Sequence, residues 1–259
     1  MHLLIFLSDF GLADPYVGQV KGVLHRLARG VEILDLTHEL PPYAIRSGAW
    51  MIARALPYMP EPAVWLCVVD PGVGGERQAL CVRWGDSFAL GPDNGLLTPF
   101  LDLPGARAGR IDPHSFRNPA PTFHGRDLFA PAAARLLGGD LHPPWLDGVR
   151  SSPVRCEGPG WGRDDQGWWG EVMWVDRFGN LITALPGSVL PSESSPGRLR
   201  GSLEGQPCGS LVRTFSSVGE GEGALVVGGF GTVEVVVNLG SALQQYGVGV
   251  GGKLRVAGP

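Results

Sequence analysis

The first half of the chain alternates short apolar runs with segments of helical periodicity. The runs at Leu3–Leu7, Ile33–Leu36 and Ala63–Val69 have the length and composition of buried strands. Between them, Val17–Leu27 and Ile45–Leu56 carry apolar residues at helical spacing. A fourth strand at Ala79–Trp84 and an alanine-rich helix at Leu128–Leu137 follow. This alternation predicts an α/β domain with a mostly parallel sheet and helices on both faces.

The second half of the chain has strand-like runs and almost no helical periodicity. Glu171–Val175, Leu181–Ala184 and Thr232–Val237 are examples. Between the two halves, 141–165 is rich in proline, glycine and charge, as linkers are. We therefore predict an α/β domain at 1–145 that carries the catalytic residues. A smaller antiparallel β domain at 166–259 would complete the binding site.

Composition excludes several classes of protein. The chain has 259 residues and a net charge of −4, so no basic surface indicates a nucleic-acid partner. Its first apolar run is far too short to span a membrane or to form a signal peptide. The four cysteines are widely spaced and form no C-x-x-C pair, which favours free thiols in a reducing compartment. We expect a cytoplasmic protein without a membrane or nucleic-acid partner.

Acidic residues recur where predicted strands end. Asp9 follows the first strand, Asp35 ends the second, Asp70 follows the third, and Asp93 follows the apolar pair at Ala89. Ligands of open parallel sheets bind beyond the carboxyl ends of the strands. These carboxylates would therefore share one edge, which would suit a cationic ligand. Each alone is also ordinary turn chemistry, because Asp-Gly and Pro-Asp-x-Gly sequences form turns.

Three other kinds of site are poorly supported. Asp70–Gly75 is rich in glycine but lacks the lysine and the spacing of a phosphate-binding loop. No G-x-S-x-G motif indicates a nucleophilic serine. His124–Asp127 is the main metal candidate, but Arg126 between the possible ligands argues against a cation. We therefore expect no metal site.

Ordered motifs along nearly the whole chain resemble one family. They are Ser8–Leu12, Tyr16–Gly22, Asp35–Pro42, Val68–Gly74, Pro92–Thr98, Thr122–Asp127, Val175–Asn180 and Val233–Gly240. Together they are similar to the S-adenosyl-L-methionine (SAM) hydrolases that form adenosine, also called SAM hydroxide adenosyltransferases. These enzymes are relatives of the SAM-dependent fluorinase and chlorinase. The stretch from Pro186 to Phe215 matches weakly.

The resemblance implies a homotrimer whose site lies between the α/β domain of one subunit and the β domain of its neighbour. It implies that Asp9 binds the ribose hydroxyls and that Tyr43 covers the ribose. Asp14 and Asp176 would lie near the methionine ammonium. The remaining implied binding residues are Phe178, Asn180 and Phe215 around the adenine, and Asn238 at the methionine end. Gly229 stands where many relatives have a serine, so backbone N–H groups would replace one contact to the methionine carboxylate.

The branch of the family depends on Asp70. The halogenases carry a tyrosine at this position, whereas the hydrolases carry an Asp, an Arg and a His at the positions of Asp70, Arg77 and His124. The resemblance therefore implies that these three are catalytic. The sulfonium of SAM leaves as a neutral thioether, so the site must supply an oriented nucleophile but no acid. Asp70 beside Arg77 would be an ionised base for water, and His124 would orient the water or relay its proton.

The function expected from this comparison is hydrolysis of SAM to adenosine and L-methionine, with no cofactor. Two alternatives remain open. One is a SAM-dependent 5′-halogenase, which Asp70 disfavours. The other is a sensor that binds SAM or adenosine with little turnover. Without the resemblance, the same three residues would be interpreted as an Asp–Arg ion pair beside a helix-capping histidine.

Overall fold

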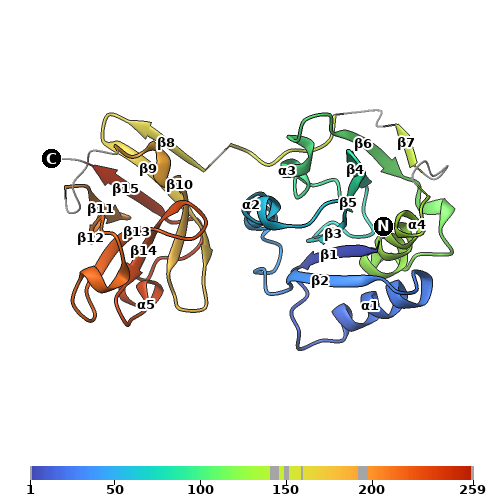
Figure 1. Cartoon of the computed structure of the whole chain (residues 1–259), viewed down its shortest axis with the longest axis horizontal. Helices are drawn as coiled ribbons and strands as arrows, with labels where there is room; N and C mark the ends of the chain where they lie inside the picture. Colours follow the sequence, from blue (N-terminus) through green and yellow to red (C-terminus); the bar gives the residue numbers. More distant parts are fainter. Residues whose placement is uncertain (1, 141–145, 149–151, 159, 192–197, 258–259) are drawn as a thin grey trace. The chain divides into compact units, whose positions relative to one another are not determined.

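A computed structural model describes residues 2–140, 146–148, 152–158, 160–191 and 198–257. The chain divides into two compact units, Met1–Cys156 and Glu157–Pro259 (Figure 1). Part of the predicted linker at 141–165 lies outside the described residues. The four cysteines are free, as predicted. None of the helices in the described ranges is both long and apolar enough to cross a membrane.

The first unit is built on a seven-stranded sheet in the order β2-β1-β3-β5-β4-β6-β7. Its strands are β1 (Leu3–Ser8), β2 (Glu32–Thr37), β3 (Val64–Val68), β4 (Ala79–Trp84), β5 (Ser87–Pro92), β6 (Arg107–Ile111) and β7 (Leu146–Gly148). Strands β2, β1, β3 and β5 are parallel, whereas β4, β6 and β7 add antiparallel pairs. The predicted α/β class is confirmed, and the sheet is mixed.

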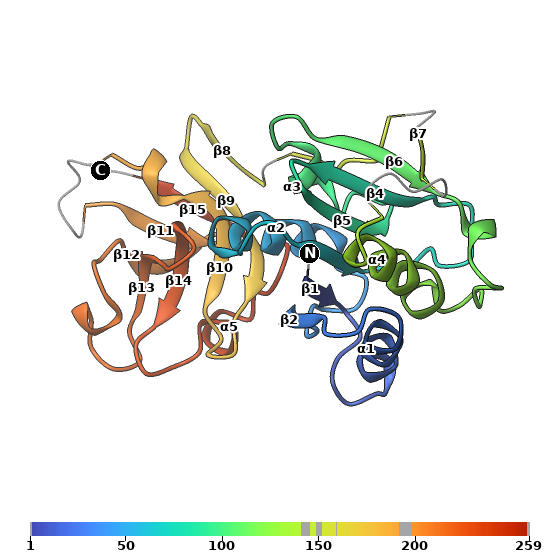
Figure 2. The same ribbon diagram turned by 45° about the vertical axis from the view of Figure 1, so that its right-hand side comes forward.

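Helices cover both faces of this sheet. They are α1 (Tyr16–Leu27), α2 (Ile45–Ala55), α3 (Thr98–Leu101) and α4 (Ala130–Leu137). Helices α1 and α4 lie side by side and share a buried cluster with Leu66 and Val68 of β3 (Figures 1 and 2). Trp65, which precedes Leu66 in β3, points to the opposite face and packs edge-on against Phe100 of α3. The alternation of buried side chains along β3 thus gives both faces a core.

The second unit is a nearly barrel-like antiparallel sheet. Its path runs β12-β11-β15-β9-β10-β14-β13, and β8 pairs with β9. The strands are β8 (Trp161–Asp164), β9 (Gly167–Val175), β10 (Leu181–Pro186), β11 (Arg200–Leu203), β12 (Gln206–Ser210), β13 (Gly223–Val227), β14 (Thr232–Val237) and β15 (Lys253–Ala257). A short helix, α5 (Ala242–Tyr246), follows β14. Alternate residues Val233, Val235 and Val237 of β14 point into its core.

Candidate functional site

Asp70 and Arg77 form a doubly bonded ion pair just beyond the end of β3. Nε of Arg77 donates to Oδ1 of Asp70 at 2.9 Å and to Oδ2 at 3.1 Å, and Nη2 also contacts Oδ2. The side chains are 5% and 12% exposed for Asp70 and Arg77, respectively. Such fork-shaped pairing fixes the carboxylate plane. Oδ1 accepts only one of these bonds and keeps a second lone pair for a water molecule or ligand.

His124 joins this pair through the arginine. Nη2 of Arg77 lies 2.9 Å from Nδ1 of His124. A guanidinium can only donate, so Nδ1 accepts and the ring proton is on Nε2. Burial and the adjacent Arg77 lower the pKa of His124, which agrees with a neutral ring. His124 precedes a π-helical turn at Gly125–Phe129 that leads directly into α4.

Gly74 explains how two distant loops meet at this point. It has a φ of +76°, and a Cβ there would lie 2.3 Å from the carbonyl oxygen of Pro121. Only glycine permits such a close approach in this conformation. The loop that carries Asp70 and Arg77 therefore packs directly on the loop that leads to His124.

Asp9 lies in the same pocket as Asp70, after the neighbouring strand β1. Its Oδ2 accepts the backbone N–H of Tyr43 at 2.9 Å. Tyr43 holds a left-handed φ of 68°, and its side chain is exposed. Burial raises the pKa of Asp9, and the charge of Asp70 adds to this rise. Two neighbouring carboxylates make the pocket favourable for a cation.

A pocket of about 360 Å³ brings together four of the predicted residues of the first unit: Asp9, Tyr43, Asp70 and His124. Arg77 reaches it through Asp70 and His124. Asp14 is exposed and does not line it. Asp14 also does not cap α1: Pro15 holds that position with no side-chain cap, and the helix begins at Tyr16.

Three aromatic side chains line this pocket and were not among the predicted site residues. Phe123 meets Phe10 and Tyr16 edge-on, with ring centroids 5.8 Å and 5.4 Å away. All three lie in the motifs discussed above, but an aromatic residue beside a strand or helix is more often part of the core. Only the positions of Phe10 and Phe123 in loops next to Asp9 and His124, and of Tyr16 at the start of α1, could have indicated them.

In the second unit, Asp176 organises a turn between β9 and β10. Its Oδ1 accepts the backbone N–H groups of Phe178 and Asn180 at 2.9 Å, and its Oδ2 accepts the side-chain amide of Asn180 at 2.8 Å. Gly179 provides the positive φ that this turn requires. Asp176 thus holds Phe178 and Asn180 in place and does not itself line a described pocket.

The turn borders a second pocket, of about 570 Å³, that lies within the second unit. Four predicted residues, Phe178, Asn180, Phe215 and Asn238, line it together with Val237, Leu239, Gly240, Ser241 and Gln244. The side-chain amide of Asn238 donates to the carbonyl oxygen of Val218 at 2.8 Å, which fixes its orientation. Two exposed aromatic rings beside two amides can hold a flat polar ring. Among the described residues of the chain, no three His, Cys, Asp or Glu side chains gather as a metal site.

The chain matches known proteins over almost its whole length. Residues 4–143 match the SAM hydroxide adenosyltransferase N-terminal domain, and residues 170–255 match the C-terminal domain of the same family. The (R)-S-adenosyl-L-methionine hydrolase of Salinispora tropica is 42% identical, over 97% of this chain and 96% of that protein. The enzyme of the same name from Thermus thermophilus is 41% identical, over 99% of this chain and 100% of that protein.

A crystal structure of a conserved protein from Thermotoga maritima has the same fold, with a TM-score of 0.88 and 32% identity. The match covers 98% of this chain and 100% of the Thermotoga maritima chain. The fluorinase of an Actinoplanes species is more distant, with 27% identity over 53% of this chain. The chain belongs to the SAM hydroxide adenosyltransferase family.

Proposed function

We propose that this protein hydrolyses SAM to adenosine and L-methionine. The observation that carries the proposal is the Asp70–Arg77–His124 cluster, which adjoins a pocket that also contains Asp9. The hydrolases from Salinispora tropica and Thermus thermophilus are similar over nearly the full length and support the same reaction. The fluorinase matches only about half of the chain, which makes halogenation the weaker alternative.

The reaction is a displacement at the ribose C5′. The oxygen of a water molecule forms a bond to C5′ while the bond from C5′ to sulfur breaks. Both electrons of that bond stay on sulfur, which leaves as the neutral thioether of methionine. The water passes one proton to Asp70, which later releases it to solvent. Arg77 holds the carboxylate in a fixed plane.

We propose that His124 positions Arg77. Its Nδ1 is occupied by Arg77, so that nitrogen is not available as a base for water. Its Nε2–H is left to donate to the attacking oxygen or to the ribose. Asp70 is then the base, and His124 acts through orientation.

Substrate binding would use both units. Asp9 would accept the ribose hydroxyls, with Tyr43 over the sugar, and the two carboxylates of the first pocket would favour the sulfonium. Phe178, Phe215 and Asn180 would frame the adenine, and Asn238, which lines the same pocket, would lie at the methionine end. Asp176 would support this pocket through its turn, and the exposed Asp14 would meet the methionine ammonium from outside the first pocket. We propose a homotrimer in which each site combines the first unit of one subunit with the second unit of its neighbour.

The names of the relatives specify the configuration at sulfur. We propose that this chain also acts on the (R) epimer of SAM, as the hydrolases from Salinispora tropica and Thermus thermophilus are named for doing. We place the protein in the cytoplasm, in keeping with its four free cysteines.

Product analysis tests the reaction. The purified protein is incubated separately with the (R) and (S) epimers, and the products are separated by chromatography. Adenosine and methionine, formed faster from the (R) epimer, are the expected products. A halogenated nucleoside in the presence of halide would identify the halogenase alternative, and bound but unchanged SAM would identify the sensor.

Two further measurements address the mechanism and the assembly. In heavy-oxygen water, a single turnover should place the label at the 5′ hydroxyl of adenosine. Unlabelled adenosine would mean that a carboxylate attacks first. Light scattering should give the mass of three chains, and an active monomer would rule out a site shared between subunits.

A further inference from the structure

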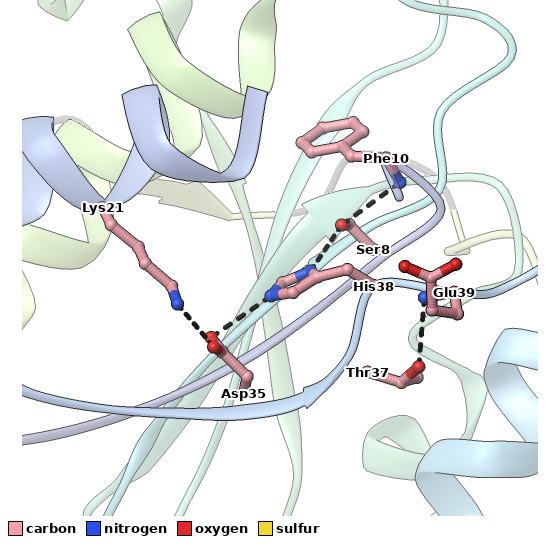
Figure 3. Close-up of polar contacts among 7 residues, drawn as sticks. All are labelled: Ser8, Phe10, Lys21, Asp35, Thr37, His38 and Glu39. Carbon is pink, nitrogen blue, oxygen red and sulfur yellow. Dashed lines mark hydrogen bonds and ion pairs between the residues drawn. The ribbon is translucent and has the colours of Figure 1, made fainter. Parts of the chain in front are cut away.

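Four polar side chains form a connected chain that begins at Ser8, the residue before Asp9 in the sequence (Figure 3). It consists of Ser8 at the end of β1, His38 just after β2, Asp35 in β2 and Lys21 in α1. Ser8 and His38 are 0% and 3% exposed. Neither lines the pocket that contains Asp9.

The contacts of His38 give the chain a direction. Ser8 Oγ lies 2.7 Å from Nδ1 of His38, and Nε2 lies 3.2 Å from Oδ1 of Asp35. Burial lowers the pKa of His38, so its ring is neutral. Nε2 approaches Asp35 without completing a hydrogen bond, and with the ring proton on this nitrogen, Nδ1 accepts the hydroxyl proton of Ser8. Lys21 holds Asp35 from the other side.

The same two residues hold the main chain on both sides of Asp9. The backbone N–H of Phe10 donates to Ser8 Oγ at 3.4 Å, and that of Gly11 donates to the carbonyl oxygen of His38 at 2.7 Å. The ring of His38 also packs edge-on against Phe6, with centroids 4.5 Å apart. The imidazole is thus held by Ser8 and Phe6, and the Ser8–Gly11 loop is bonded to His38 at two points, through the Ser8 hydroxyl and the Gly11 N–H.

We propose that Ser8 and His38 are positioning residues that fix the Asp9 carboxylate for substrate binding. The inference rests on the proposed function, in which Asp9 binds the ribose. A well-placed carboxylate loses little freedom when it binds, and a mobile one loses more. Because Asp70, Arg77 and His124 stand on other loops, a defect in this network raises KM and leaves kcat nearly unchanged.

The main test is a double-mutant cycle between Ser8→Ala and Asp9→Asn. Ser8→Ala alone should raise KM about three- to tenfold, the effect of about one hydrogen bond. In the Asp9→Asn background the same change should raise KM less than about twofold, because the group being positioned no longer carries its charge. A KM increase of equal size in both backgrounds would show that the network does not act through Asp9 and would overturn the proposal.

Two variants of His38 provide an independent test. His38→Asn places an amide oxygen near the position of Nδ1 and keeps an acceptor for Ser8. His38→Gln extends toward Asp35 and loses that acceptor. KM should stay within about twofold of wild type for the first and rise about three- to tenfold for the second. Equal KM values for the two folded variants would contradict the proposal.

Ser87→Ala is the matched control. Ser87 is a buried serine of the same sheet, at the start of β5, and its hydroxyl accepts the backbone N–H of Ala63 at 3.2 Å. Its loss should lower the melting temperature without changing KM or kcat. A purely structural role of Ser8 would give this same result, and an unchanged KM in the Ser8→Ala protein would sink the idea. Calorimetry with SAM separates a failure of this positioning proposal from a failure of the proposed function. A wild-type protein that binds SAM but does not turn it over contradicts the proposed function alone.

Discussion

Arg77 binds Asp70 and His124 with the same guanidinium group, and its Nη2 lies 2.9 Å from Nδ1 of the histidine. The histidine therefore meets the carboxylate through the arginine. This order of contacts supports the proposed ranking, in which the carboxylate acts as the base, the arginine fixes it, and the histidine supports the arginine. The first two predictions test that ranking.

Asp70→Asn keeps the size of the side chain and removes its charge. We expect kcat to fall about 10²–10⁴-fold, the usual range for loss of a general base. SAM binding should persist, because Asp9 and the second unit are unchanged. Single-turnover kinetics and calorimetry on the same preparation check both statements. A folded, SAM-binding variant with near-normal kcat would refute the assignment of Asp70 as the base.

His124→Asn keeps an acceptor near the position of Nδ1 for Arg77, whereas His124→Ala removes it. We expect kcat to fall less than about tenfold for His124→Asn and more for His124→Ala, because only the alanine variant removes the acceptor that Nη2 of Arg77 contacts. In wild type, burial and Arg77 lower the pKa of His124. Acid therefore protonates it only below about pH 6.5, where kcat should fall. This fall of kcat at low pH should be smaller in the His124→Asn variant, which has no imidazole to protonate. If kcat of the His124→Asn variant fell as far as that of Asp70→Asn, proton transfer would instead be assigned to Nε2 of His124.

Gly74→Ala should reduce activity without touching the ligand. Its φ of +76° and the 2.3 Å approach to Pro121 leave no room for a Cβ. We expect a loss of about 2 kcal/mol or more in unfolding free energy and a lower kcat, since the loops of Arg77 and His124 would separate. Gly105→Ala is the control: its φ is +74°, and nothing lies within 4 Å of the added Cβ. It should cost about 1 kcal/mol and leave kcat intact. Equal kcat values for the two variants would count against the role of this contact.

Glu234 predicts an unusual dependence of stability on pH. It is 6% exposed, and burial, with the nearby charge of Asp176, raises its pKa from 4.5 to about 7. Between these values the folded protein holds a proton that the unfolded chain releases, so the contribution to stability is lost as pH rises. Glu234→Gln should therefore stabilise the protein by about 1–3 kcal/mol near pH 8 and change it little near pH 4.5.

Denaturant unfolding at the two pH values measures this effect. Glu32→Gln is the control, because Glu32 is an exposed carboxylate on β2. A Glu234→Gln protein no more stable than wild type near pH 8 would mean that the carboxylate is well compensated in the fold.

The parallel half of the sheet was predictable because its strands are nearly continuous apolar runs, as in β3. The antiparallel half was predictable only in part: the strand at Ala79–Trp84 was predicted, but its antiparallel pairing was not. Strand β6 reads Arg-Ala-Gly-Arg-Ile, with only Gly109 and Ile111 buried, and its place depends on pairing with β4. The helix predicted at Val17–Leu27 is confirmed, and α1 begins one residue earlier, at Tyr16.

The strand-end rule places Asp9 and Asp70 in one pocket because β1 and β3 are neighbours. It cannot find Arg77 or His124, which are 47 residues apart and meet through tertiary packing. Only the resemblance to known motifs indicated them. The turn role of Asp176, in contrast, is written in the local sequence: an Asp followed by Gly179 and Asn180 is the pattern of a side chain that bonds its own turn.

The two pockets differ in charge, and this has a thermodynamic consequence. The described lining of the second pocket, from Phe178 to Gln244, contains no ionisable side chain. Binding there should be insensitive to ionic strength and should carry the negative heat-capacity change of apolar burial. The first pocket, with Asp9 and Asp70, depends on electrostatic attraction that salt weakens. Under the proposed function, salt concentration should therefore affect SAM binding mainly through the first pocket, and temperature mainly through the second.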